Sequence, residues 1–166
     1  WWILIVLTVL IIILISISNQ KASPSVTAVS GYWNIHSKHS PGEYSKWFDN
    51  TLALNCPYVF FYEDEKVKEF VSEKRKDIPT TFLKKPMHNF SVNATYKDEW
   101  THGQHVPNPN LGKIWIEKVK LVQEAAKRNV YGTEWFMWVD AGNALYRDRK
   151  PPASPWPNSE INLPTD

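Results

Sequence analysis

The feature that most constrains this chain is a short apolar run that stops at an acid. Trp135–Val139 reads W-F-M-W-V, and Asp140, Ala141 and Gly142 follow it. The run is too short to span a membrane, so it predicts a β-strand buried on both faces of a sheet. In open α/β sheets, ligands bind outside the carboxyl ends of the strands. Asp140 is therefore either a ligand-binding acid or the first residue of a turn.

Strand-like and helix-like patterns alternate through the rest of the chain. Strands are predicted at Ser25–Trp33, Tyr58–Tyr62, Thr80–Leu83 and Trp135–Val139, and helices at Glu43–Asn55, Lys66–Lys76 and Leu111–Asn129. This alternation predicts βαβ units, an α/β fold and a mainly parallel sheet. Residues 86–110 show little periodicity, and irregular segments of that length are often functional.

The N-terminal residues 1–17 are apolar apart from Thr8 and Ser16. As a helix they extend roughly 25 Å, near the short limit for crossing a bilayer. We expect a transmembrane signal-anchor at 1–17 and a polar stem at 18–24, with a cleaved signal peptide as the alternative. The sequence thus predicts a single-pass membrane protein, with an orientation that its charges do not specify.

Two N-glycosylation acceptor motifs lie close together, at Asn89-Phe90-Ser91 and Asn93-Ala94-Thr95. Downstream of an apolar anchor, they predict a domain that faces the lumen of the Golgi or the endoplasmic reticulum.

The composition excludes several classes of protein. Nineteen basic and seventeen acidic residues leave a formal charge of +2, which is not the footprint of a nucleic-acid-binding domain. A single cysteine, Cys56, excludes an internal disulfide and a multi-cysteine metal site. The nine tryptophans fill a core or stack on bases and sugar rings.

Several short motifs occur in an order that resembles one family. They are V-T-A-V-S-G-Y-W at 26–33, Tyr44-x-x-Trp47-Phe48, Y-V-F-F-Y at 58–62, I-W-I-E-K at 114–118, and W-V-D-A-G at 138–142 with Arg147 downstream. Over roughly residues 25–150 the chain resembles the HtrL/YibB family, a grouping regarded as glycosyltransferase-like. The resemblance implies a GT-A fold, a Rossmann-like three-layer α/β/α sheet, with residues 25–166 as the N-terminal portion of that domain.

The resemblance also implies transfer of a sugar from a nucleotide-diphosphate donor to a glycan or protein acceptor. Asp140 takes the place of the D-x-D motif, whose carboxylates hold Mn²⁺ or Mg²⁺ against the donor diphosphate. Because the third position here is Gly142, the alternative is stabilisation of the diphosphate by Lys118 and Arg147 without a metal.

The segment Ser30, Gly31 and Tyr32 closes the first predicted strand, where the resemblance implies contact with the nucleotide. The donor-binding residues expected in this way are Ser30, Gly31, Tyr32, Lys118, Asp140, Ala141, Gly142 and Arg147. The sequence identifies no general base. The acids Glu63, Asp64 and Glu65 either serve the site or complement the start of a helix.

Two further functions remain open from the sequence. One is a non-catalytic glycan- or protein-binding module on the same fold, favoured by Gly142 in place of an acid. The other is a zinc hydrolase that uses His36 with His39 and His102 with His105, pairs that have ligand-like spacing.

Overall fold

The computed structural model describes residues 26–35, 40–100, 106 and 108–157. The predicted signal-anchor at 1–17, the stem at 18–24 and both histidine pairs lie outside these residues. Across the part that is described, no helix has both the length and the hydropathy needed to cross a bilayer.

The described residues form a four-stranded parallel sheet flanked by helices. The elements in chain order are β1 (Val26–Tyr32), α2 (Pro41–Leu52), β2 (Tyr58–Tyr62), α3 (Glu65–Lys74), β3 (Thr80–Lys84), the 3₁₀ turns η1 (Met87–Asn89) and η2 (Ser91–Ala94), α4 (Pro109–Arg128), β4 (Trp135–Trp138) and η3 (Ala144–Tyr146). The predicted α/β class and parallel sheet are confirmed, with differences of a few residues at the ends of elements.

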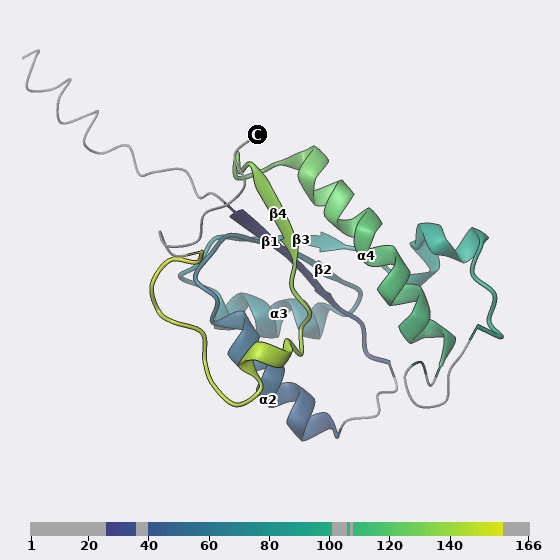
Figure 1. Ribbon diagram of the computed structural model, residues 1–166, viewed down its shortest axis with the longest axis horizontal. Helices are drawn as coiled ribbons and strands as arrows, with labels where there is room; N and C mark the ends of the chain where they lie inside the picture. The colour runs from purple at the N-terminus through teal and green to yellow at the C-terminus, as the bar shows by residue number, and fades with distance from the viewer. Residues whose placement is uncertain (1–25, 36–39, 101–105, 107, 158–166) are drawn as a thin grey trace, which may run out of the picture.

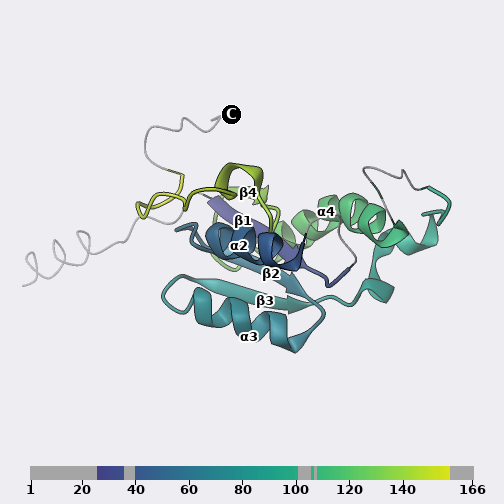
Figure 2. The ribbon, with the colours of Figure 1, turned by 90° about the horizontal axis from the view of Figure 1, so that it is seen from below.

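The strand order is β3-β2-β1-β4. Figure 2 shows the same order from bottom to top, with β3 lowest and β4 highest. The chain moves outward from β1 to β2 and β3 through α2 and α3. It then returns through α4 to place β4 on the other side of β1. Figure 1 shows α2 and α3 on one side of the strands and α4 on the other. The order of the strands therefore reverses between β1 and β4.

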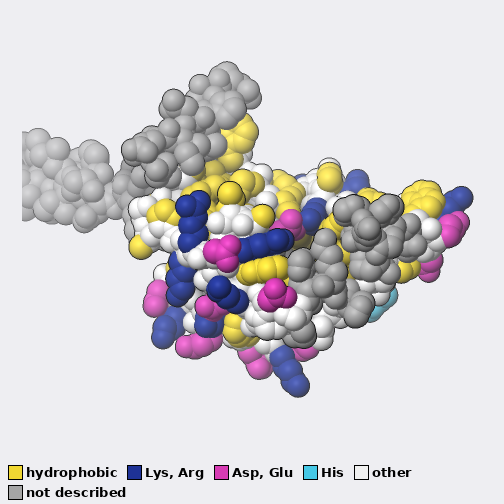
Figure 3. Space-filling view, turned by 60° about the horizontal axis from the view of Figure 1, so that its bottom comes forward, with side chains coloured by type: hydrophobic (Ala, Val, Ile, Leu, Met, Phe, Trp, Pro, Cys, Tyr) yellow, Lys and Arg dark blue, Asp and Glu magenta, His cyan; other side chains and the backbone are white. Residues whose placement is uncertain are grey.

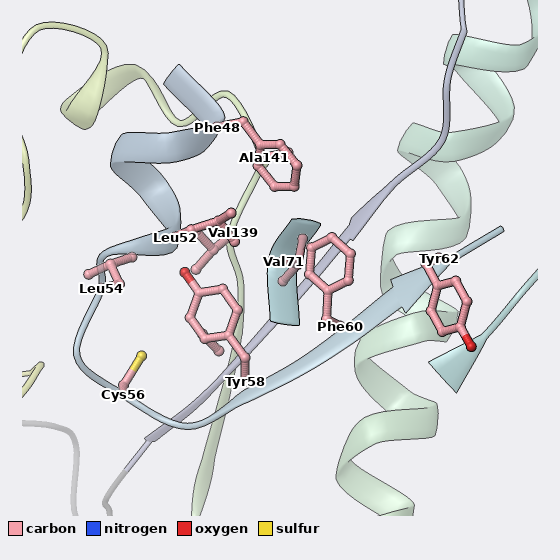
Figure 4. Packing of buried hydrophobic residues seen from close by; sticks show 11 residues of the cluster. Phe48, Leu52, Leu54, Cys56, Tyr58, Phe60, Tyr62, Val71, Val139 and Ala141 are labelled. Carbon is pink, nitrogen blue, oxygen red and sulfur yellow. The ribbon is translucent and has the colours of Figure 1, made fainter. Parts of the chain in front are cut away.

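Two apolar cores cover the two faces of the sheet. On the α2 and α3 face, Tyr58 and Phe60 of β2 pack with Phe48, Leu52 and other buried side chains, which Figure 4 shows pointing toward one another. On the α4 face, the alternate residues of β1 and β2 pack against the helix; they are Val29, Val59 and Phe61, with Leu121 and Ala125 of α4. The period of two along β2 distributes its side chains between both cores.

The prediction that Trp135–Val139 is buried on both faces is wrong for the strand itself. β4 pairs with β1 and forms an edge of the described sheet, and Met137 is 38% exposed. Phe136 and Trp138 pack toward α4, and Val139 just beyond the strand is buried in the other core. A run of apolar residues indicates burial of the segment but does not distinguish a central strand from an edge strand.

Each of the three α-helices of the described chain begins with a side-chain cap. Ser40 and Glu43 form a capping box at α2, Asp64 caps α3, and Asn108 caps α4. The cap at α3 shows that Asp64 starts a helix, which was one of the two alternatives for the acids after β2. Because α2 and α3 follow parallel strands and α4 returns before β4, all three helices begin at the carboxyl edge of the sheet.

The irregular segment after β3 is held to α4 by a buried carboxylate. Glu117, 1% exposed, accepts hydrogen bonds from the backbone N–H groups of Ser91 and Val92 and from the Ser91 hydroxyl. Asn89 and Asn93 are exposed on this segment. The predicted glycosylation sites therefore lie on the surface of the domain.

Candidate functional site

A pocket of about 900 Å³ opens at the carboxyl edge of the sheet, among the ends of β1 and β4 and side chains of α2, α3 and α4. Gly31 and Tyr32 line it from the end of β1, and Trp138, Asp140 and Ala141 line it from the end of β4. These two strands are the neighbours between which the strand order reverses. The pocket thus occupies the position where open α/β sheets bind their ligands.

One wall of the pocket is aromatic. Tyr32 stacks on Phe48 with ring centroids 5.2 Å apart and lies 5.7 Å from the ring of Tyr44. Burial raises the pKa of Tyr32. Burial, the neighbouring Tyr32 and the charge of Asp140 together raise the pKa of Tyr44 to about 12. Both phenols are therefore neutral hydrogen-bonding groups near neutral pH.

Two exposed aromatic side chains belong to the same pocket lining. Phe70 comes from α3 and Trp115 from α4. Flat rings of this kind provide surfaces on which bases or sugar rings stack.

Asp140 is exposed but not free. Its Oδ1 accepts a hydrogen bond from Trp138 Nε1 at 2.7 Å and lies 2.6 Å from Lys118 Nζ. The Lys118 ammonium also lies 5.6 Å from the centre of the Trp138 ring. The side chain of Asp140 is 57% exposed and that of Lys118 is 22% exposed, so their attraction contributes little to stability.

These residues do not fit a resident divalent ion by themselves. Mg²⁺ and Mn²⁺ prefer several oxygen ligands, and Asp140 is the single acid among the described residues that line the pocket. Its Oδ1 already faces the Lys118 ammonium. No group of three or more potential metal ligands occurs in the described ranges. A diphosphate would have to supply most of the ligands to any metal bound here.

Of the segment expected to contact the nucleotide, Gly31 and Tyr32 line the pocket while Ser30 is buried within β1. A Cβ at Gly31 would lie 2.6 Å from the Trp33 ring. Glycine is therefore required at position 31 because the Trp33 side chain of the protein itself approaches the backbone there.

The segment after Asp140 separates into residues inside and outside the pocket. Ala141 lines the pocket. Gly142 packs against the Tyr44 ring, and a Cβ added to Gly142 would lie 3.2 Å from that ring. Arg147 is not among the lining residues. Its guanidinium stacks over Trp47 at 4.1 Å, and its Nε is buried without a hydrogen-bond partner. The sequence predicted that Arg147 binds the donor diphosphate together with Lys118. In the structure, η3 returns the chain to α2 before Arg147.

No protein-family model matches the chain, and neither does any curated protein or solved structure. The interpretation of the pocket therefore depends on its geometry and on the residues that line it.

Sequence reasoning did not identify several lining residues. Lys66 and Phe70 belong to the first two turns of α3, and Trp115 lies one turn before Lys118 on α4. Their signal was available: Lys66 follows closely after the end of a predicted strand, and Trp115 has the helical spacing that places it beside Lys118. The acids Glu63 and Glu65 do not line the pocket; they contact Met87 N and Lys84, respectively.

Charges of both signs occur together on the face that Figure 3 shows. The Lys and Arg side chains of the described residues are interspersed there with Asp and Glu. Nucleic-acid-binding domains instead gather cations along one stripe.

Proposed function

We propose that the protein is a GT-A-like glycosyltransferase that binds a nucleotide-diphosphate sugar in this pocket and transfers the sugar to a glycan or protein acceptor. The observation that carries the proposal is the position of Asp140 and Lys118. Both line a pocket at the carboxyl end of β4, beside the end of β1, where the strand order reverses.

The size and lining of the pocket support a ligand of this class. Its volume of about 900 Å³ is in the range of pockets that bury small organic ligands. The aromatic wall offers stacking surfaces for a base or a sugar. The cations Lys66 and Lys118, with one acid among the described lining residues, favour an anionic ligand, as do the starts of three helices at this edge.

The proposed reaction breaks the bond between the anomeric carbon and the oxygen of the donor diphosphate, and that electron pair leaves with the nucleoside diphosphate. An acceptor hydroxyl oxygen forms the new bond to the anomeric carbon, and its proton passes to water. In this pocket Lys118 and Lys66 stabilise the negative charge that develops on the diphosphate. No described residue is assigned as the base that receives the proton.

A membrane anchor at 1–17 and a location in the Golgi or the endoplasmic reticulum remain predictions from the sequence. They agree with a glycosyltransferase of the secretory pathway, and the exposed Asn89 and Asn93 are accessible for modification there.

Binding of sugar nucleotides tests the proposal. The full chain, purified in a mild detergent, is titrated by calorimetry with a panel of UDP- and GDP-sugars, each with and without Mn²⁺. We expect binding of at least one donor, weakened about tenfold or more by Asp140→Ala because charged hydrogen-bonding groups of the site lose their arrangement. The matched control is Asp148→Ala, an exposed acid outside the pocket. Absence of binding by the whole panel contradicts the proposal.

A second candidate function is a glycan-binding module without catalysis. It is favoured by the pairing of Asp140 with Lys118 and Trp138, which is also compatible with a site that needs no metal and no diphosphate. A glycan array separates the two functions. Glycan binding that survives Asp140→Ala, together with no binding of any sugar nucleotide, favours the module.

A further inference from the structure

We infer that Lys118, in place of a divalent ion, is the cation that binds the donor diphosphate, and that Asp140 is a positioning residue that holds Lys118. This inference rests on the proposed function, because it specifies how the same pocket receives its ligand.

The first support is the direction in which Lys118 points. Leu111, Ile114 and Lys118 are spaced by three and four residues on α4, and all of them line the pocket. Residues with this spacing share one face of a helix. The Lys118 side chain is only 22% exposed, so most of it packs along the pocket wall, and its ammonium lies beside Asp140, which also lines the pocket.

The second support is the way in which the ammonium is fixed. Trp138 Nε1 and Lys118 Nζ contact the same oxygen of Asp140, at 2.7 Å and 2.6 Å. The Trp138 ring also lies 5.6 Å from the ammonium, within the range of a cation–π contact. These contacts restrict a side chain that is otherwise flexible, which reduces the entropy lost when a ligand binds.

The third support is the number of donors that remain. A lysine ammonium has three N–H donors, and the one ion pair that it forms with a described residue uses Asp140. Donors therefore remain for phosphate oxygens. Lys66 of α3 adds a second positive charge to the same lining. Two cations against one acid match an anionic diphosphate.

The surroundings of Asp140 are less suitable for a divalent ion than for the ammonium. It would have to compete with Lys118 for Oδ1, and the described lining offers it no second carboxylate. Because a hard cation needs several oxygen ligands, this arrangement favours the ammonium as the resident positive charge.

The test compares UDP and GDP as probes, by calorimetry on the full chain in detergent, in EDTA and in Mn²⁺. We expect the affinity for the nucleoside diphosphate that binds to agree within about twofold between the two conditions. Lys118→Met removes charge-assisted hydrogen bonds to phosphate and should weaken binding about tenfold or more. Lys118→Arg keeps the cation and should restore most of the affinity. Lys120→Met is the matched control, because Lys120 is exposed on the same helix outside the pocket.

The role of Asp140 is tested with one variant that keeps its size but not its charge, and one that keeps its charge on a longer side chain. Asp140→Asn should weaken binding about threefold in both EDTA and Mn²⁺, because the ammonium keeps a weaker acceptor. Asp140→Glu should recover part of the loss. If Asp140 only stabilised the fold, its variants would lower the thermal midpoint of unfolding. The fraction of protein able to bind would then fall with the folded fraction, and the affinity of the folded protein would not change.

Two different results overturn two different statements. Binding of UDP or GDP that requires Mn²⁺, with Lys118→Met unchanged, overturns this inference and leaves the proposed function standing. No binding of either probe in either condition, with no sugar nucleotide bound, overturns the proposed function and this inference with it.

Discussion

Two cations at opposite edges of the same sheet lie in different surroundings. Arg75 lies at the amino edge and is 2% exposed. Its Nη1 donates to the carbonyl oxygens of Leu52 and Leu54, and its Nη2 donates to that of Cys56. Lys118 at the carboxyl edge is 22% exposed and pairs with one carboxylate.

The difference lies in how many donors are already used. Arg75 also donates from Nε to Thr80 Oγ1 and stacks over the Tyr58 ring at 3.6 Å. It thereby joins the segment between α2 and β2 to the start of β3. A cation whose donors are filled by the protein stabilises the fold, whereas a cation with donors to spare, such as Lys118, is available to a ligand.

The largest effect on stability is expected at the amino edge. Arg75→Met removes the guanidinium that donates to the carbonyl groups of Leu52, Leu54 and Cys56. The free energy of unfolding should fall by about 3 kcal/mol, measured by urea denaturation. Arg128→Met, at an exposed pair with Glu124, is the control and should change it by less than about 1 kcal/mol. A loss at Arg75 no larger than at Arg128 contradicts the comparison.

A second large effect is expected one residue before Lys118. Glu117→Ala removes the acceptor for the N–H groups of Ser91 and Val92 and for the Ser91 hydroxyl. The free energy of unfolding should fall by about 2 kcal/mol, while the affinity for nucleoside diphosphate changes little. Glu117→Gln keeps an acceptor oxygen and should be milder. We expect Glu117 to stabilise the fold and the neighbouring Lys118 to bind the ligand. Loss of binding in a folded Glu117→Ala protein would contradict this.

Alkaline pH should affect both edges. Burial raises the pKa of Tyr58 strongly and that of Tyr44 to about 12. Unfolded tyrosines lose their protons near pH 10, whereas the folded protein keeps these protons. Stability from these groups is therefore complete below about pH 10 and decreases as the pH rises from there toward 12. Tyrosinate absorbance and circular dichroism should change together; ionisation of every tyrosine before any loss of structure would contradict this expectation.

The smallest effect on stability is expected at the pocket. Lys118→Met should change the free energy of unfolding by less than about 1 kcal/mol, because the pair with Asp140 is partly exposed. Thermal unfolding monitored by circular dichroism measures it. A loss comparable to that of Arg75→Met would assign Lys118 to the fold and remove the contrast between the two edges.

The sequence predicts the bounds of the helices and strands better than it predicts which strands lie side by side in the sheet. The strand Tyr58–Tyr62 is observed with the predicted bounds, because its apolar run ends sharply at Glu63. That Trp135–Trp138 is an edge strand depends on the strand order, and a periodic pattern does not encode this order.

The same limit applies to the site. Lys118 and Asp140 were both expected to bind the donor, but their pairing depends on α4 returning beside β4. Arg147 follows Asp140 closely in sequence, yet η3 turns the chain back onto α2, where Asn50 bonds to the carbonyl groups of Tyr146 and Arg147. Long-range packing, which local patterns do not specify, decided both outcomes.

The reversal of strand order has a consequence for how the pocket is built. From the seam between β1 and β4, the adjoining helices lie on opposite sides of the sheet, so the hollow is a product of chain connectivity and not of any one side chain. Tyr44 and Trp115 form parts of its walls, whereas the strand order determines where it lies. Lys66, Trp115 and Lys118 line the hollow but belong to neither apolar core, so the chemistry of these walls is separate from the packing that holds the sheet.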